Sequence, residues 1–373
     1  MARASDVSGT DDGSAVPPPE AADYAVSLVL EHAVERALAP GVAAAIVTRG
    51  GLRRRFCRGA LSYEPGAFAV DEATVFDLAS LTKLLATTRL VARAVDEGSV
   101  RLDEAPWPAW PGVTVAHALR HDGGLVAHRP FFELARAAGV AGLPAGHRLV
   151  VDAALATPPE APPGARTVYS DLGFLALGEL LVQRRGRRLE EQLVDVIPVK
   201  SGLRFVRLAD DGYHPALPLV APTERCPWRR RVVQGQVHDD NAYAMGGAAG
   251  HAGLFGSVVD VEAAALSLLD AVQGRGTLAA WATSAGPRGL GFDKATPGGS
   301  TGAALGSRTV GHLGFTGTSV WLDPDLDGGA AVVLLSNAVH PDRTDVVARN
   351  RALRQAFHVA AAAWVRASSS SSS

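Results

Sequence analysis

Apolar residues recur at every third or fourth position of residues 23–38, which predicts an amphipathic helix that ends before Pro40-Gly41. Two segments typical of strands follow, the apolar residues 42–48 and residues 52–59, and a Gly-rich turn separates them. Segments of this length joined by such a turn predict a pair of antiparallel strands. The chain is therefore expected to open with a helix and a β-hairpin.

Helical spacing dominates the middle of the chain, where loops rich in Pro and Gly separate the helical segments. The predicted helices there cover residues 81–97, 115–121, 131–138, 172–183 and 259–272. The pattern then changes to short apolar segments that predict strands, at residues 309–312, 318–323 and 329–336. A last helix is predicted over residues 344–365.

This order of elements predicts an α+β fold in which both ends of the chain build one lobe. We expect residues 21–79 and 286–366 to form an α/β sandwich, an antiparallel sheet flanked by helices. Residues 80–285 are expected to form an inserted, mainly helical lobe, with a ligand cleft between the lobes. Residues 1–20 are predicted to be a disordered extension, and residues 367–373, mostly serine, a flexible tail.

The composition excludes some classes of partner. A net charge of −2 gives no reason to expect nucleic acid, and no stretch of about 18 apolar residues is present that could span a membrane. The first residues lack the apolar run of a signal peptide, so we expect a cytoplasmic protein.

Cys57 and Cys226 lack metal-ligand spacing and are expected to be free thiols, with a disulfide between them left open. The oligomeric state is also left open.

Lysine is scarce in this chain, and one lysine stands at a suggestive distance from a serine. Only three of the 36 basic residues are lysines, and Lys83 follows Ser80 by three positions among apolar neighbours. A desolvated lysine can lose its proton and act as a base, whereas arginine stays protonated. If a helix begins here, both side chains share one face, and the helix amino terminus stabilises an oxyanion on Ser80. A helix start with a solvated lysine is the alternative interpretation.

Two further segments carry candidate chemistry. The tripeptide Tyr169-Ser170-Asp171 precedes a predicted helix. Tyrosine has an unperturbed pKa of about 10, so it needs a neighbouring cation such as Lys83 to act as a base. Residues 311–319 (GHLGFTGTS) place glycines where a strand edge can approach a ligand and offer a backbone N–H to an oxyanion. An anchoring tyrosine and a plain Gly-rich turn are the alternatives.

Two other classes of protein compete with a serine hydrolase. His117 and His121 are spaced to share a helix face and could bind zinc with His238 or His251. The glutamate of the H-E-x-x-H arrangement is missing between the first two, so we expect no metal and no cofactor. The second class is a sensor or binding protein that keeps the lobes without turnover. Retention of serine, lysine and tyrosine together favours hydrolysis.

The order of these segments is typical of one superfamily. The chain resembles the serine β-lactamases and penicillin-binding proteins, whose three motifs match residues 80–83 (SLTK), residues 169–171 (YSD) and residues 312–314 (HLG). It resembles their class C β-lactamase-like and esterase branch over residues 23–365. Three more segments resemble recurring parts of that branch, namely residues 119–125 (LRHDGGL), 238–242 (HDDNA) and 249–255 (AGHAGLF).

The resemblance implies a role for each motif. It implies that Ser80 is the acylated nucleophile, that Lys83 takes or steers its proton, and that Tyr169 is a second general base and acid. Asp171 would hold the lysine, and His312 would contact the substrate or activate the tyrosine. The expected fold is accordingly that of the β-lactamases and transpeptidases.

The resemblance further implies an oxyanion hole made by the N–H groups of Ser80 and Phe315. Gly314 and Thr316 are expected to contact the substrate. The implied function is a serine hydrolase that forms an acyl-enzyme with a small-molecule or peptide substrate.

The chain departs from the β-lactamase motifs at three positions. Asp171 replaces the usual Asn, and its carboxylate should favour the ammonium form of Lys83 and shift the base role to Tyr169. His312 and Leu313 replace the usual Lys and Thr, so a permanent charge and a hydroxyl for a substrate carboxylate are lost. We therefore expect hydrolysis of an ester, an amide or a cell-wall-derived peptide rather than efficient β-lactamase action.

Overall fold

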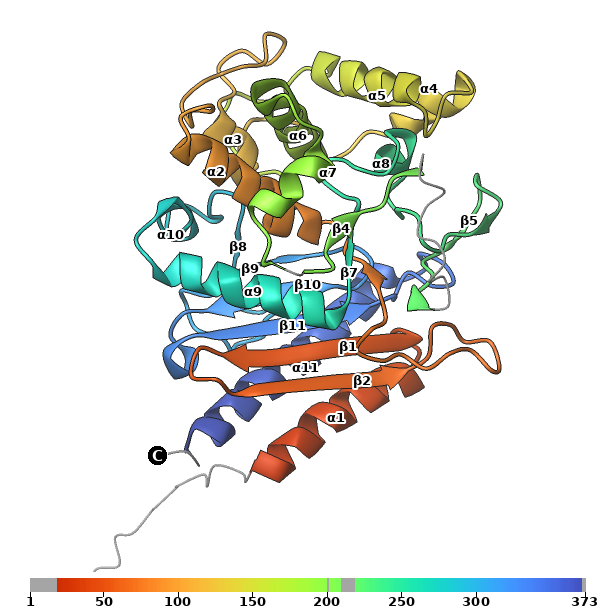
Figure 1. The fold of residues 1–373 in the computed structure, drawn as a ribbon, viewed down its shortest axis with the longest axis vertical. Coiled ribbons are helices and arrows are strands. Elements are labelled where there is room, and N and C mark those ends of the chain that lie inside the picture. Colours follow the sequence, from red (N-terminus) through yellow and green to blue (C-terminus); the bar gives the residue numbers. More distant parts are fainter. Residues whose placement is uncertain (1–18, 200, 209–218, 371–373) are drawn as a thin grey trace, which may run out of the picture.

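A six-stranded antiparallel sheet is the framework of one lobe in the computed structural model, which describes residues 19–199, 201–208 and 219–370 (Figure 1). The strand order is β2-β1-β11-β10-β9-β8. These strands are β1 (Gly41–Thr48), β2 (Arg53–Gly59), β8 (Asp293–Lys294), β9 (Val310–Leu313), β10 (Ser319–Asp323) and β11 (Ala330–Ser336). Because β1 pairs with β11, the beginning and the end of the chain build the same sheet.

The residues of β1 explain why this strand is buried on both faces. Successive side chains of a strand point to opposite sides. Val42 packs in a core with α1 (Pro19–Glu35) and α11 (Val346–Ser370), whereas its neighbour Ala43 packs in a second core with α9 (Val258–Gln273). Small and β-branched side chains along the whole strand therefore let helices cover both faces of the sheet.

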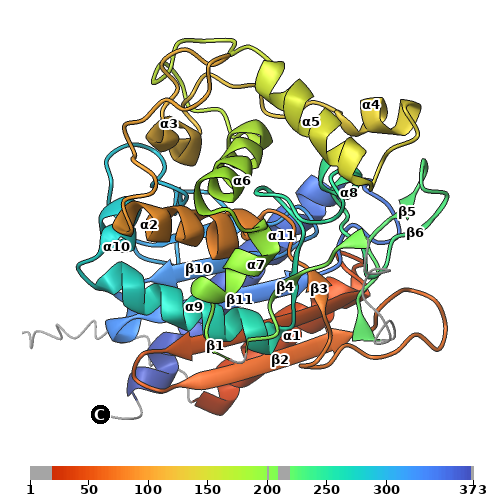
Figure 2. The same cartoon turned by 45° about the horizontal axis from the view of Figure 1, so that its top comes forward.

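The second lobe is mainly helical and lies on the α9 side of the sheet, away from α1 (Figures 1 and 2). Its helices are α2 (Arg89–Asp96), α3 (Val115–Arg120), α4 (Phe132–Ala137), α5 (Pro144–Ala156), α6 (Asp171–Arg185), α7 (Leu189–Gln192) and α8 (Asp240–Ala244). The central helix α6 is apolar on almost every face and accordingly buried.

Short elements complete the fold. A small sheet has the order β3-β7-β4, with β3 (Phe76–Asp77), β7 (Leu254–Gly256) and β4 (Arg204–Phe205). The remaining short elements are the ribbon of β5 (Arg225–Cys226) and β6 (Arg231–Val232), the helix α10 (Thr277–Ala282), a π-helical segment (Lys83–Thr88), and 3₁₀ turns at Leu193–Asp195 and Leu326–Gly328. The strand β3 matters most for function, because the chain runs from it directly into Ser80.

The predicted fold class is confirmed, but one lobe boundary is wrong. The predicted helical lobe, residues 80–285, includes α9, and the structure packs α9 against β1 and β11 of the sheet. Its apolar face, which includes Val261, Ala265 and Leu268, is buried in the core between the sheet and the helical lobe. This helix therefore belongs to the sandwich lobe.

The terminal segments also differ from the prediction. The flexible tail was predicted to begin at residue 367, yet α11 continues to Ser370, and Ala367 and Ser368 are buried. The reason is that Ala367 extends the apolar face of α11. At the other end, α1 begins at Pro19, and the rest of the predicted extension, like residues 371–373, lies outside the described residues.

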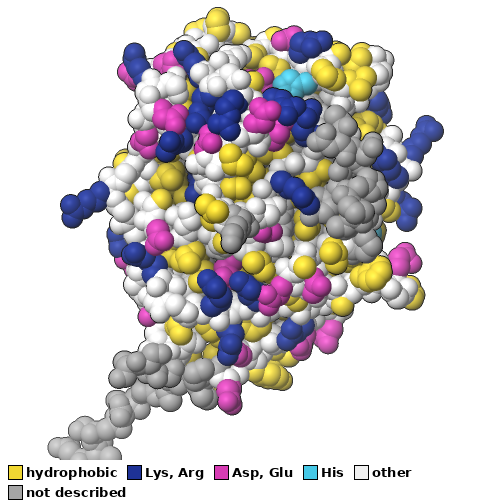
Figure 3. All heavy atoms as spheres, viewed as in Figure 1, with side chains coloured by type: hydrophobic (Ala, Val, Ile, Leu, Met, Phe, Trp, Pro, Cys, Tyr) yellow, Lys and Arg dark blue, Asp and Glu magenta, His cyan; other side chains and the backbone are white. Residues whose placement is uncertain are grey.

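The surface is mixed in charge. Basic and acidic side chains are interspersed over the face shown in Figure 3. Of the helices within the described ranges, none combines the length and apolar character needed to cross a membrane. Cys57 and Cys226 are free thiols, the first half-buried and the second buried.

Candidate active site

Ser80 lies in a tight turn between β3 and the helix that begins at Leu81. The preceding residue, Ala79, has a φ of 47°, a left-handed conformation that costs about 1–2 kcal/mol for a residue with a Cβ. Hydroxyl groups from the sheet hold this turn: Thr318 donates to the Leu78 carbonyl at 3.1 Å. The strained turn presents the Ser80 side chain to the cleft between the lobes.

Asp77 is the carboxylate that fixes this turn, and sequence reasoning missed it. Its Oδ1 accepts a hydrogen bond of 2.8 Å from the Ala79 N–H, and its Oδ2 accepts one of 2.6 Å from the His238 N–H. The side chain is buried, and burial raises its pKa although both N–H groups lower it. An Asp two residues before a strained position is the signal that could have identified it.

Lys83 lies directly beneath Ser80 and has no exposure to solvent. Its Nζ is 3.0 Å from Ser80 Oγ, 2.8 Å from Asp171 Oδ1 and 3.1 Å from the backbone oxygen of His251. Burial lowers the pKa of Lys83, but Asp171 and Tyr169 raise it more, so the net shift is upward. The structure thus brings the predicted pair together with the lysine as an ammonium ion.

Asp171 is the first residue of α6, and it connects Lys83 to a histidine that the sequence did not reveal. Its Oδ2 lies 3.3 Å from His128 Nδ1. Burial raises the pKa of Asp171, but Lys83 and His128 lower it more, so it is a carboxylate. The hydrogen bond to Asp171 in turn raises the pKa of His128 against the effect of burial. The structure thus places Asp171 in direct contact with Lys83.

Tyr169 lies over the lysine, and its ring centroid is 5.0 Å from Lys83 Nζ. The ring also packs against His121, with 4.6 Å between centroids, and the Arg288 guanidinium lies 5.2 Å from the ring centroid. Burial raises the pKa of Tyr169, and although Lys83 and Ser80 lower it, the net shift is upward. The resting tyrosine is therefore a neutral phenol.

His312 on β9 is buried and neutral. Its Nδ1 lies 2.8 Å from the Leu313 carbonyl, which can only accept, so the proton must be on Nδ1. Within the described chain the Nε2 atom has no hydrogen-bond partner and is left as an acceptor. Burial lowers the pKa of His312 to about 4, with Asp293 opposing this and Lys83 adding to it. The His312 ring centroid lies 5.8 Å from that of Tyr169.

The third motif approaches the Ser80 turn very closely. A Cβ at Gly314 would lie 2.0 Å from Thr318 Oγ1 and 2.6 Å from the Leu78 oxygen, so only glycine fits. Neither the Ser80 N–H nor the Phe315 N–H donates a hydrogen bond within the described residues. Both residues line the cleft, as the predicted oxyanion hole requires.

Thr316 was predicted to contact the substrate, and the structure gives it another position. Its hydroxyl donates to the Asp77 carbonyl at 2.8 Å, and the residue is 1% exposed and absent from the cleft lining. Its side chain therefore supports the Ser80 turn from below. Gly314, the other residue with this predicted role, does line the cleft.

The cleft holds about 550 Å³ and combines side chains from both lobes. Ser80, Tyr169 and His312 lie among its walls, with Lys83 buried beneath. The segments 119–125 and 238–242 support this site. The Ser170 N–H donates to His121 Nδ1 at 3.0 Å, and Asp239 Oδ1 lies 3.0 Å from His251 Nε2.

The four histidines considered for zinc make other contacts. His117 Nδ1 lies 2.9 Å from Thr114 Oγ1, and His121 Nδ1 accepts from the Ser170 N–H. Among the described residues they form no common group that could hold a metal.

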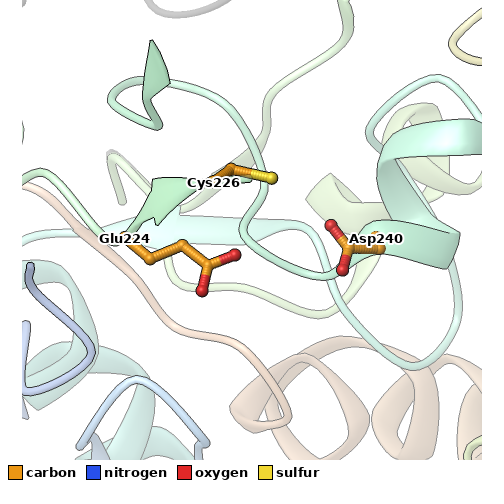
Figure 4. A group of neighbouring side chains, drawn as sticks. All are labelled: Glu224, Cys226 and Asp240. Atoms are coloured by element: carbon orange, nitrogen blue, oxygen red, sulfur yellow. The ribbon is translucent and has the colours of Figure 1, made fainter. Parts of the chain in front are cut away.

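A different trio, Glu224, Cys226 and Asp240, brings ligand atoms within 4.8 Å of one another (Figure 4). Both carboxylates already accept hydrogen bonds from Arg343, and Asp240 also accepts one from Arg229. These guanidinium groups supply the positive charge that a metal would otherwise bring. The trio fits an ion-pair network better than a metal centre.

The antiparallel sheet, the helical lobe and the serine above a buried lysine together define the β-lactamase and transpeptidase class of fold. The chain belongs to the Beta-lactamase family, a family of serine hydrolases, because the family model matches residues 29–357. The predicted resemblance is therefore confirmed.

Known proteins of several activities are similar to this chain. A protein of Escherichia coli (strain K12) named "Putative D-alanyl-D-alanine carboxypeptidase" is 28% identical over 314 residues, 73% of this chain and 71% of that protein. Simvastatin synthase (LovD) from Aspergillus terreus, as the LovD6 mutant, has a TM-score of 0.65 at 21% identity, covering 95% of this chain and 99% of its own. EstCE1, a hydrolase with promiscuous acyltransferase activity, has a TM-score of 0.66 at 20% identity, covering 91% and 99%. The two structures show a shared fold.

Proposed function

We propose that this protein hydrolyses an ester, an amide or a cell-wall-derived peptide through an acyl-enzyme on Ser80. The observation that carries the proposal is the 3.0 Å contact between Ser80 Oγ and Lys83 Nζ in the cleft. Beside it, the N–H groups of Ser80 and Phe315 have no acceptor among the described residues. A nucleophile, a fixed cation and two donors for an oxyanion are the parts that acyl transfer needs.

In the acylation step the resting charges assign the proton path. Lys83 is an ammonium ion, so it stabilises negative charge on Ser80 Oγ rather than accepting its proton. The Ser80 proton moves to the Tyr169 oxygen, and the phenol proton passes to Nε2 of His312 once the two rings, 5.8 Å apart between centroids, have moved into hydrogen-bond contact. Ser80 Oγ then attacks the substrate carbonyl, and the new oxyanion accepts hydrogen bonds from the Ser80 and Phe315 N–H groups. Each such donor is worth about 3 kcal/mol of barrier.

In the remaining steps, collapse of the tetrahedral adduct and deacylation, each proton returns to the group that lost it. When the tetrahedral adduct collapses, the bond to the leaving group breaks, and the leaving group takes a proton from Tyr169, which recovers one from His312. Water next attacks the acyl-enzyme and loses its proton along the same path. The bond to Ser80 Oγ breaks, and Ser80 regains its proton from Tyr169.

The cleft rim supports a substrate with an apolar part. Phe315 is 42% exposed and Val347 is 73% exposed, and both line the cleft. The name of the Escherichia coli relative supports a D-alanyl peptide as a candidate, and that of EstCE1 supports an ester. The neutral His312 and the apolar Leu313 give less support to β-lactam turnover.

A covalent probe tests the proposal. We expect a fluorophosphonate to label the protein at Ser80, as mapped by mass spectrometry, and Ser80→Ala to abolish both labelling and hydrolysis of p-nitrophenyl butyrate. Ser99→Ala, which removes a hydroxyl bonded to the Ala94 carbonyl away from the cleft, is the matched control. Nitrocefin and a D-Ala-D-Ala peptide in the same assay separate the substrate classes. Labelling without turnover of any substrate would support the alternative of a sensor.

A further inference from the structure

Arg89, the first residue of α2, is a buried cation outside the active site. The residue is 8% exposed. Its Nη1 donates to the Ala264 carbonyl at 3.4 Å and its Nη2 donates to Ser267 Oγ at 3.2 Å, both on α9. Within the described ranges its Nε makes no hydrogen bond, and the guanidinium pairs with no carboxylate. The charge of Arg89 is therefore left without a counter-ion.

Arg89 lines a groove that is separate from the Ser80 cleft. The groove is bordered by α2, by the end of α9 and by the beginning of α10, and Figures 1 and 2 show α10 beside both other helices. It holds about 510 Å³ and shares no lining residue with the cleft. Its apolar lining consists of Ala92, Val196, Ile197, Ala271 and Leu278. The groove is thus large enough for a small molecule.

The other charged side chains of the groove make polar contacts of their own. These contacts are Arg93 with Glu97, Asp195 with Arg185 and Arg187, and Asp96 with the Thr277 hydroxyl. Asp96 is exposed, so solvent screens its charge, whereas Arg89 is buried. Among the described residues that line the groove, Arg89 is therefore the buried charge that nothing compensates.

A buried charge without a counter-ion is costly unless other groups replace the lost water. One carbonyl and one hydroxyl compensate only part of the charge of Arg89. Burial lowers the pKa of Arg89 to about 10, so the guanidinium is still protonated at neutral pH. An anion that enters the groove would gain an ion pair in surroundings of low dielectric constant.

The lining of the groove decides which class of anion fits. The carboxylates of Asp96 and Asp195 lie in the same groove, so a phosphate dianion is repelled more strongly than a monoanion. The apolar side chains bury a hydrocarbon group favourably but offer no partner to further polar atoms. A single carboxylate on an apolar body meets both conditions.

We propose that this groove is a second binding site, in which Arg89 pairs with a small monocarboxylate that has an apolar body. The inference does not rest on the proposed function. Because α2 continues the π-helical segment that begins at Lys83, a ligand bound to Arg89 would also connect the end of this helical run to α9 and α10. An occupied groove should accordingly stabilise the folded protein.

Calorimetry with a matched acid and amide tests the inference. We expect 4-phenylbutyrate to bind the wild-type protein at least about tenfold more tightly than 4-phenylbutyramide, and also more tightly than inorganic phosphate. Arg89→Met keeps an apolar side chain and removes the charge, so the preference for the acid should disappear. Arg136→Met, which removes an exposed arginine of α4 outside the groove, is the control and should keep the preference.

A second variant and a stability measurement separate binding from a general effect on folding. Ala271→Phe fills the groove and leaves Arg89 in place, and it should also abolish binding of the acid. Without ligand, Arg89→Met should have the same Tm as wild type or a higher one, because it removes an uncompensated buried charge. Added 4-phenylbutyrate should raise the Tm of wild type and leave that of Arg89→Met unchanged.

Several results would overturn the inference. A Kd above about 1 mM for 4-phenylbutyrate, or equal affinities for the acid and the amide, would show that the groove is not a carboxylate site. A preference retained in Arg89→Met would place the ligand elsewhere, and tighter binding of phosphate would refute the monocarboxylate class. Labelling of Ser80 and ester hydrolysis are separate measurements, so the proposed function is tested independently of this site.

Discussion

At the scale of single residues, the protonation of Lys83 is decided by its neighbours. The three hydrogens of its ammonium group meet Ser80, Asp171 and the His251 carbonyl, and the side chain is fully buried. The sequence alone suggests a lysine that loses its proton on burial. Burial does lower the pKa of Lys83, but the carboxylate of Asp171 at 2.8 Å and the Tyr169 phenol together raise it by more, so the expectation is reversed.

The contacts of Lys83 predict that a positive charge at position 83 is not by itself enough for activity. Lys83→Arg keeps the positive charge, but a planar guanidinium cannot place donors at all three acceptors in a cavity shaped for an ammonium. We expect kcat/KM for p-nitrophenyl butyrate to fall on the order of 10²- to 10³-fold, as for loss of one oxyanion donor. Lys294→Arg, at the edge strand β8, should have little effect. Full activity of Lys83→Arg would contradict the assigned role.

The pKa of His312 predicts how kcat/KM changes at acidic pH. Burial lowers its pKa from 6.5 to about 4, and only the neutral ring accepts a proton from Tyr169. The value of kcat/KM should therefore stay level as the pH falls from 7 to about 5 and decrease as it passes about 4. A fall in kcat/KM with its midpoint near pH 6.5, the ordinary pKa of histidine, would exclude His312 as the proton acceptor.

Stability must be followed in the same pH series. The unfolded chain binds a proton at His312 near pH 6.5, before the folded protein does, so the free energy of unfolding should decline from about pH 6.5 to about pH 4. Circular dichroism at each pH separates this decline from a loss of catalysis in folded protein.

The residues of contiguous motifs could be predicted from the sequence, and the others could not. Ser80 and Lys83 belong to one helical turn, so their contact follows from spacing. His128, Arg288 and Arg354 reach the cleft from loops or helices far from the motifs, and only the tertiary structure places them there.

At the scale of elements, the turn between β3 and the helix after it carries the nucleophile. Three groups that are distant in sequence hold it: the hydroxyls of Thr316 and Thr318 and the backbone of the loop at His238. A strained Ala79 in such a turn fixes the direction of Ser80 without any contact with the substrate.

Loss of the Asp77 carboxylate should release this turn. Asp77→Ala leaves the N–H groups of Ala79 and His238 without their acceptor, which should lower the free energy of unfolding by about 1–3 kcal/mol. We also expect slower labelling of Ser80 by a fluorophosphonate, with kcat reduced more than KM is changed. Asp71→Ala is the matched control, because Asp71 accepts from the Ala73 N–H in the same way at an exposed position. Equal labelling rates in both variants would show that Asp77 is merely structural.

Periodicity identified the longer elements because it reports which side of an element is buried. The hairpin of β1 and β2 and the helices α6 and α9 were predicted nearly to their ends. The helix α5 was missed, since it begins at Pro144 and contains Gly146, residues that usually mark loops. Gly146 is needed there because a Cβ would lie 2.2 Å from the Val140 oxygen.

At the scale of the whole molecule, the lobe organisation followed from the order of elements, but the position of α9 did not. The amphipathic pattern of α9 predicts that one face is buried, but it does not indicate which element covers that face. In the structure that partner is the sheet, with Glu262 of α9 bonded to Arg53 and Arg55 of β2. Contacts between segments about two hundred residues apart cannot be read from local periodicity.

The dependence of the cleft on α11 has a consequence for how the protein becomes active during its synthesis. Asn350 donates to the Phe315 carbonyl at 2.9 Å, and Arg354 donates to the Gly314 carbonyl, so the segment facing Ser80 is secured by a helix that leaves the ribosome later than either. A nascent chain that already displays Ser80 and Lys83 still lacks this support. Acyl transfer should therefore switch on only after α11 has been made and has packed on the sheet, which keeps a chain without α11 from reacting with esters.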